Sequence, residues 1–195
     1  AIWDRYPQFR PVDEVKLDDI KLYLAERAAS IDLLDRAAGF VSDVLTKVED
    51  PVARAKMGTQ LSGIFLLDGK PQEAIKALAD TADQAAQIPE SLRDERRILQ
   101  ARSLFGQNKP DDALALLAND YTDPATRLRA DITWQTKRWP ESAAALDALI
   151  GPPPPDGQKL ADGLSPLVVN RATALVLADD TEGLTALRVK FGAAM

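Results

Sequence analysis

The chain has 195 residues, of which 46% are hydrophobic and 28% are charged, and its formal net charge at pH 7 is −6. Such a length and composition indicate a globular chain with a substantial core and exclude an intrinsically disordered one. The acidic balance argues against nucleic-acid binding, which needs a basic surface, and the absence of cysteine and histidine excludes disulfides, thiol nucleophiles, histidine-based catalysis and Cys/His zinc sites. We therefore expect no catalytic residues, no cofactor and no metal.

No stretch approaches the roughly 18–20 consecutive apolar residues that a membrane span requires, so direct membrane insertion by this chain is not expected. No signal-peptide pattern is present at the start. The chain opens on Ala1 without an initiator methionine, which suggests a piece of a longer protein whose other parts can carry an anchor. A soluble domain without cysteine suits the cytoplasm and the periplasm equally, so the compartment stays open.

Residues 1–12 lack helical periodicity and are predicted to form an extended arm whose aromatic side chains pack on the first helical hairpin. From residue 13 onward alanine and leucine dominate, and apolar residues recur at spacings of three and four, as in Leu17, Ile20 and Leu24. This pattern predicts an all-α fold. About ten helices are expected, at residues 13–28, 30–48, 51–67, 71–87, 90–106, 110–119, 123–136, 140–150, 164–178 and 181–192.

Proline marks most of the expected helix starts. In one group a side-chain oxygen that can cap the helix precedes the proline, and in a second group acidic residues follow it, where they oppose the positive end of the helix dipole. The first group is Asp50-Pro51, Asp123-Pro124 and Ser165-Pro166, and the second begins at Pro71, Pro110 and Pro140.

Residues 151–163 contain four consecutive prolines, Pro152 to Pro155, and are predicted to form a stiff extended loop. A polyproline ligand for a partner domain is the alternative.

One pattern occurs three times: SGIFLLDGKPQEAIKAL from Ser62, ARSLFGQNKPDDALALL from Ala101, and ADITWQTKRWPESAAAL from Ala130. Each segment carries small residues in two successive helices and a turn between them, at the same spacing. Gly69 and Asn108 at the turn suit a left-handed helix end. A weaker fourth copy starts at Ala172.

This pattern resembles the tetratricopeptide (TPR) repeat, whose turn and second helix are similar to GKPQEAIKAL and NKPDDALALL. The copies recur at intervals of 39, 29 and 42 residues, whereas the family has about 34. The resemblance implies an α/α superhelix of antiparallel helix pairs, with repeats at about 51–88, 89–121, 122–150 and 164–192 and with 13–50 as an N-terminal hairpin lacking the signature. An irregular helical bundle is the alternative.

A TPR-like solenoid implies a non-catalytic interaction module that binds a protein or peptide partner in a concave groove lined by the first helix of each pair. Arg102, Phe105, Arg127 and Trp134 are the expected anchors, although the two aromatic residues can instead be core residues between layers. The full set of predicted groove residues is Lys56, Thr59, Arg102, Phe105, Arg127, Asp131, Trp134 and Gln135.

Two other functions are weighed against this one. The chain can self-associate through its N-terminal hairpin or through the exposed end of the solenoid, or it can position substrate for a catalytic domain outside this sequence. The basic cluster Arg93, Arg96 and Arg97 is interpreted as a solvated helix face. Adjacent acidic pairs such as Asp111-Asp112 diverge by about 100° on a helix and are not expected to bind a metal.

Overall fold

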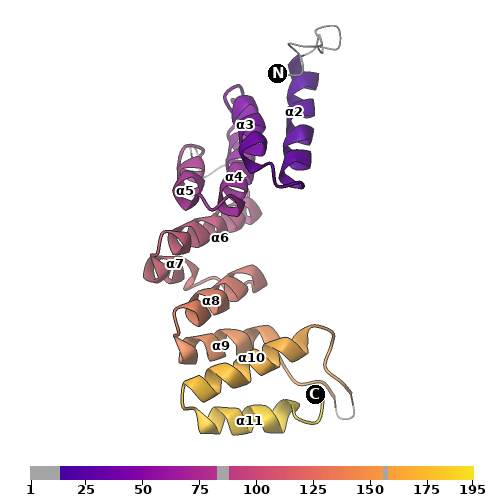
Figure 1. Ribbon diagram of the computed structural model, residues 1–195, viewed down its shortest axis with the longest axis vertical. Coiled ribbons are helices and arrows are strands. Elements are labelled where there is room, and N and C mark those ends of the chain that lie inside the picture. Colours follow the sequence, from indigo (N-terminus) through magenta and orange to yellow (C-terminus); the bar gives the residue numbers. More distant parts are fainter. Residues whose placement is uncertain (1–13, 83–87, 156–157) are drawn as a thin grey trace. The chain divides into compact units, whose positions relative to one another are not determined.

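The computed structural model describes residues 14–82, 88–155 and 158–195, so the arm expected at 1–12 lies outside the described residues. Over the described residues the chain is all-α and contains no strand (Figure 1). The helices are α2 (Glu14–Ala29), α3 (Leu34–Leu45), α4 (Pro51–Leu67), α5 (Pro71–Ala79), α6 (Glu90–Gly106), α7 (Pro110–Leu117), α8 (Asp123–Gln135), α9 (Trp139–Ile150), α10 (Leu164–Leu177) and α11 (Thr181–Phe191).

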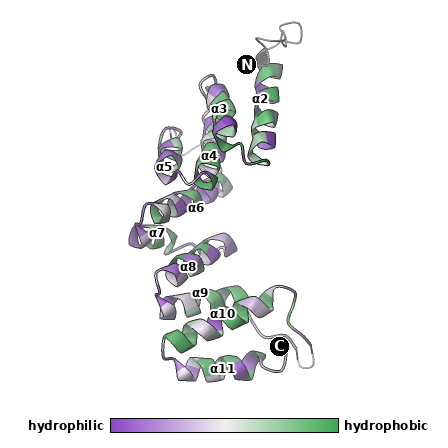
Figure 2. Ribbon diagram, in the orientation of Figure 1, coloured by the Kyte–Doolittle hydropathy of each residue, from purple (hydrophilic) through white to green (hydrophobic). Residues whose placement is uncertain are grey.

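The chain divides into two compact units, Ala1–Gln107 and Asn108–Met195. In the first unit each helix from α2 to α6 packs against the next, and α4 also contacts α6. In the second unit α7 to α11 pack in the same successive manner. Hydrophobic and hydrophilic residues are interspersed along the helices of both units (Figure 2), which is what two-sided packing of short helices requires.

Two expected helices are too long. The helix expected at 30–48 begins only at Leu34, because the preceding residues form a turn in which Asp32 has a φ of 62°. The helix expected at 71–87 ends at Ala79, and the described residues that follow it, 80–82, are not helical.

The proline signals located the helix starts well, but not every cap. Asp50 caps α4 as expected, since its carboxylate accepts a hydrogen bond of 2.7 Å from the Ala53 N–H. The cap expected from Asp123 is wrong, because α8 already begins at Asp123 and no side chain caps it. The cap expected from Ser165 is also wrong, because α10 begins at Leu164, after Gly163 in a left-handed conformation.

The turns that follow α4, α6, α8 and α10 each contain one residue in the left-handed conformation. Gly69 and Asn108 have φ values of 67° and 61°, as their residue types predict, and Lys137 and Asp179 adopt φ values of 59° and 57° at the equivalent positions. At three of these turns the next N–H donates to the carbonyl five residues back, which satisfies an otherwise unpaired helix carbonyl. These bonds are Lys70 N–H to Phe65 O (2.8 Å), Arg138 N–H to Thr133 O (2.8 Å) and Asp180 N–H to Leu175 O (2.9 Å).

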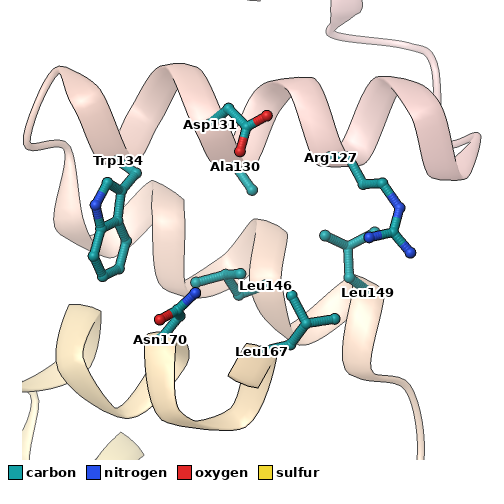
Figure 3. A pocket seen from close by; sticks show the side chains of 8 residues that line it. All are labelled: Arg127, Ala130, Asp131, Trp134, Leu146, Leu149, Leu167 and Asn170. Carbon is teal, nitrogen blue, oxygen red and sulfur yellow. The ribbon is translucent and has the colours of Figure 1, made fainter. Parts of the chain in front are cut away.

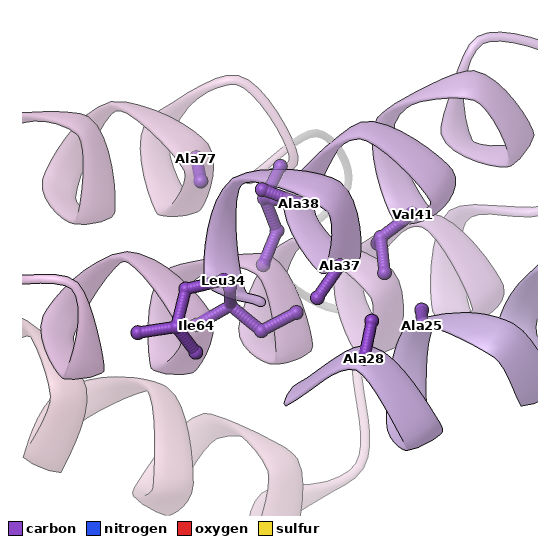
Figure 4. Close-up of a cluster of buried hydrophobic side chains, with 9 residues drawn as sticks. Ala25, Ala28, Leu34, Ala37, Ala38, Val41, Ile64 and Ala77 are labelled. Carbon is purple, nitrogen blue, oxygen red and sulfur yellow. The ribbon is translucent and has the colours of Figure 1, made fainter. Parts of the chain in front are cut away.

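The core of the first unit is built from small side chains of α2 to α5 (Figure 4). Alanine at so many contact positions lets the helix axes approach closely. Helices α2 and α3 share this core with α4 and α5, so these two helix pairs pack together. The buried cluster is Ala25, Ala28, Leu34, Ala37, Ala38, Val41, Leu61, Ile64 and Ala77.

The core of the second unit continues from α8 to α11. Ala130, Ala145 and Leu146 join α8 to α9, and a larger cluster joins α9, α10 and α11. The described part of the loop at 151–163 contains no helix and returns along the end of α11, where the Leu160 N–H donates to the Ala194 carbonyl at 3.2 Å. The larger cluster is Ala143, Ile150, Val168, Ala174, Leu175, Leu187 and Phe191.

Candidate partner-binding site

Seven of the eight predicted groove residues line three open hollows in the two units. Lys56 and Thr59 line a hollow of about 450 Å³ between α4 and α6. Two others line a second hollow in that unit, of about 590 Å³: Arg102 and Phe105. The remaining three, Arg127, Asp131 and Trp134, line a hollow of about 370 Å³ in the second unit, while Gln135 is exposed and lines none of the three.

The hollow of the second unit has an apolar floor and a polar rim (Figure 3). Leu146 and Leu149 of α9 and Leu167 of α10 form the floor. Trp134 stands at one end and Arg127 at the other, with Asp131 along the α8 side and Asn170 on α10. An apolar side chain with polar neighbours fits such a surface, because the floor removes it from water while the rim offers hydrogen bonds.

Trp134 belongs both to this hollow and to the core. Its ring is half-buried, packs against both apolar clusters of the second unit and meets Trp139 edge to face, with centroids 5.5 Å apart and an interplanar angle of 84°. Trp134 is therefore partly a core residue, as the alternative proposed, and also forms part of the wall of the hollow. Its substitution would change stability as well as any binding.

The larger hollow of the first unit repeats this chemistry. Arg102 is exposed, Phe105 is half-buried, and Leu66, Leu67 and Leu99 lie beside them. Leu67 is 73% exposed, so part of the apolar lining of this hollow is open to solvent. Each unit thus presents an arginine and an aromatic ring next to leucine side chains.

Thr59 is not a groove anchor, because its side chain is committed to the interior. It is 3% exposed, and its hydroxyl donates to the Ala55 carbonyl at 2.7 Å and accepts from Arg96 Nη1 at 3.2 Å. The expectation that Arg96 lies on a solvated face is likewise wrong. Arg96 reaches inward from α6, and burial lowers the pKa of its guanidinium, which remains protonated at neutral pH.

Arg96 ties together three helices. Besides Thr59, its guanidinium donates to the Ala55 carbonyl of α4 at 2.8 Å and to the Leu78 carbonyl of α5 at 2.6 Å. Thr81, just beyond α5, accepts at 3.3 Å. Leu78 lies in the last turn of α5, where unpaired carbonyls and the helix dipole favour a cation.

Other first helices use an arginine in a similar way. Arg54 of α4 donates to the Val48 carbonyl at 3.0 Å, just past the end of α3. Arg129 of α8 donates to the Leu117 carbonyl at the end of α7 at 3.3 Å, and also to the Asp120 carbonyl. Arg171 of α10 lies 2.6 Å from the Asp147 carboxylate of α9. Such arginines hold each first helix to the second helix before it and are not available to a partner.

Two turns carry equivalent ion pairs. Lys70, after the left-handed Gly69, pairs with Asp35 in the first turn of α3 at 2.7 Å, and this contact holds the pKa of Asp35 below its usual value. Arg138, after the left-handed Lys137, pairs with Asp111 in the first turn of α7, which raises the pKa of Arg138. Both pairs are exposed and fasten a turn to the second helix of the preceding pair.

Within the ranges that the structure describes, no group of three or more acidic side chains is placed to hold a metal ion. None of the described helices is long and apolar enough to cross a membrane. Comparison with models of protein families, with characterised proteins and with solved structures yielded no match.

The sequence analysis looked for groove residues only on the first helix of each pair, and it missed residues of the hollows that come from elsewhere. Leu146 and Leu149 belong to a second helix, and Asn170 precedes the weakest copy of the repeat. Leu146 carried a usable signal, since it lies seven residues after Trp139, two helical turns on, and on the side opposite the exposed Ala144 and Ala148.

Proposed function

We propose that this chain is a non-catalytic protein–protein interaction module, a TPR-like solenoid of divergent repeats that binds a peptide or a helix of a partner through the hollows beside its first helices. The repeated left-handed turn supports the repeat interpretation, because four different residue types, Gly69, Asn108, Lys137 and Asp179, adopt one conformation at one position of the pattern.

The observation that carries the proposal is the hollow beside α8. It combines an apolar floor of three leucines with an exposed arginine, Arg127, and an amide, Asn170. Apolar area supplies affinity, and the polar rim selects the partner and its direction. The hollow is open and shallow, which suits a segment of a macromolecule better than a reaction that needs water excluded.

The chemistry of the rim favours a partner segment in which an acidic residue neighbours a large apolar one. Arg127 in the second unit and Arg102 in the first are both exposed beside leucine floors. A guanidinium offers a carboxylate two parallel hydrogen bonds, so each arginine would fix a carboxylate next to the buried apolar side chain.

The test is selection of peptides from a random displayed library against the whole chain, followed by calorimetric titration of the enriched peptides. We expect the peptides to combine acidic and large apolar residues. Arg127→Glu should weaken those that bind the second unit by about tenfold, since an exposed ion pair is worth up to about 1 kcal/mol and reversal adds a repulsion of similar size.

Arg102→Glu tests the hollow of the first unit in the same way, and Arg36→Glu, at an exposed arginine of α3, is the matched control that should bind as the unaltered chain does. If the enriched peptides bind both the Arg127→Glu and the Arg102→Glu variants as tightly as they bind the unaltered chain, the hollows are not the binding sites and the proposal fails.

A further inference from the structure

The loop between α9 and α10 is longer than the packing of these two helices requires. Residues 118–122 suffice to connect α7 to α8, whereas residues 151–163 connect α9 to α10, although α9 and α10 are in extensive contact. Connections of that length are uncommon in compact domains, where they often carry a function. Figure 1 shows the described part of this loop extending beyond the ends of the two helices.

The loop is anchored to the second unit on both sides of its proline run. The Gly151 N–H donates to the Asp147 carbonyl of α9 at 3.1 Å. On the other side, Leu160 is half-buried against the cluster of α9, α10 and α11, and its N–H donates to the Ala194 carbonyl at 3.2 Å. The run from Pro152 to Pro155 is thus held between two fixed points.

The sequence of this run confines its backbone to the polyproline II (PPII) conformation. Each proline ring fixes φ at about −65°, and a following proline excludes helical ψ values for the residue before it. Both restrictions apply to Pro152, Pro153 and Pro154, and their peptide bonds are trans. A PPII helix has three residues per turn and rises about 3.1 Å per residue, so Pro152 and Pro155 lie on one side of it, roughly 9 Å apart.

The run offers a partner both apolar rings and hydrogen-bond acceptors. Pro152, Pro153 and Pro155 are exposed, and Pro154 is half-buried. The Pro155 carbonyl accepts from the Gln158 N–H at 3.1 Å, but no described residue donates to the carbonyls of the three prolines before it. Because proline has no N–H, the run can only accept hydrogen bonds, so a partner must supply the donors.

We propose that the run Pro152–Pro155 is itself a ligand, which docks as a preformed PPII helix in a groove of a partner domain lined by tyrosine and tryptophan. Aromatic rings pack on the proline rings, and tryptophan N–H and tyrosine O–H groups donate to the free carbonyls. The fixed backbone avoids most of the ordering entropy that a flexible peptide loses on binding. This contact is separate from the hollows beside the first helices, so either can fail without the other.

The test uses nitrogen-15-labelled SH3 and WW domains as probes, because they present two forms of such an aromatic groove. The unlabelled whole chain is titrated into each probe, and the signals of the probe's tryptophan side-chain N–H groups are followed by NMR. We expect saturable shifts in at least one probe. Pro152→Ala/Pro155→Ala should weaken that binding by about tenfold or more, because it removes both rings from one side of the PPII helix.

The matched control is Pro124→Ala/Pro166→Ala, which removes two exposed prolines from the first turns of α8 and α10 and should bind as the unaltered chain does. Circular dichroism should show an unchanged helix content for Pro152→Ala/Pro155→Ala, since the run lies between α9 and α10 and belongs to neither. A chain that shifts neither probe overturns the proposal. A probe that binds Pro152→Ala/Pro155→Ala as tightly as the unaltered chain overturns it as well.

Discussion

Arg96 is a half-buried cation whose hydrogen bonds hold the N-terminal part of α4 and the C-terminal end of α5 against α6. Arg96→Met keeps most of the aliphatic packing and removes the donors. Because hydrogen bonds to a charged group contribute about 1.5–3 kcal/mol, we expect the free energy of unfolding to fall by about 2 kcal/mol. Urea denaturation followed by circular dichroism measures it.

The matched control for this change is Arg93→Met, at an exposed arginine on the same helix, which should alter stability by less than about 0.5 kcal/mol. Equal losses in the two variants would mean that Arg96 contributes only surface charge.

Two glycines of α4 provide an internally controlled pair. A Cβ at Gly58 would lie 1.9 Å from Thr81 Oγ1, whereas a Cβ at Gly63 would have no neighbour within 4 Å. Gly58→Ala should therefore displace the threonine that accepts from Arg96, and we expect a loss of about 1–3 kcal/mol from overpacking. Gly63→Ala should gain up to about 1 kcal/mol from helix propensity.

Thermal melts measure the stability changes of Gly58→Ala and Gly63→Ala, which should have opposite signs. Shifts of the same sign would show that the close approach of α4 to the end of α5 is not maintained in solution.

At the scale of the helical elements, the left-handed turn can be tested by removing a glycine from one turn and by introducing a glycine into another. Gly69 has a φ of 67°, and no atom would clash with an added Cβ there, so Gly69→Ala isolates the backbone cost of about 1–2 kcal/mol. Lys137 adopts a φ of 59° at the equivalent turn, and Lys137→Gly should stabilise the chain by up to about 1 kcal/mol. Chemical denaturation measures both, and a loss in each variant would contradict the shared turn geometry.

The ion pair between Lys70 and Asp35 makes part of the stability depend on pH. The hydrogen bond and charge of Lys70 lower the pKa of Asp35, so the folded state favours the carboxylate. The contribution is present above the unfolded-state pKa of about 3.9 and is lost as pH falls through the lower folded-state pKa. We expect Asp35→Asn to be less stable than the unaltered chain at neutral pH, and the difference to disappear once the pH has fallen below the lowered folded-state pKa of Asp35.

Asp112→Asn, at an exposed acid in the first turn of α7, is the control for this series. A stability difference for Asp35→Asn that does not change between neutral and acidic pH would exclude the pair as its source.

The helical elements were largely readable from the sequence, because their signals are local. Pro71 and Pro110 lie at the first helical position where expected, and Asp50 caps the next helix through its own side chain. The errors arose where tertiary contacts decide. Arg96 looks like a surface residue in sequence and is directed inward by acceptors on α4 and α5, and Leu149 lines a hollow that no single helix reveals.

At the scale of the whole molecule, the contact between the rings of Trp134 and Trp139 gives this chain a near-ultraviolet circular dichroism signal. They are two of its three tryptophans, and one of them borders the hollow beside α8. Two indoles in edge-to-face contact couple electronically and produce a near-ultraviolet circular dichroism band that depends on their mutual orientation. Occupation of the hollow would tilt one indole against the other, so docking can be followed without any attached dye.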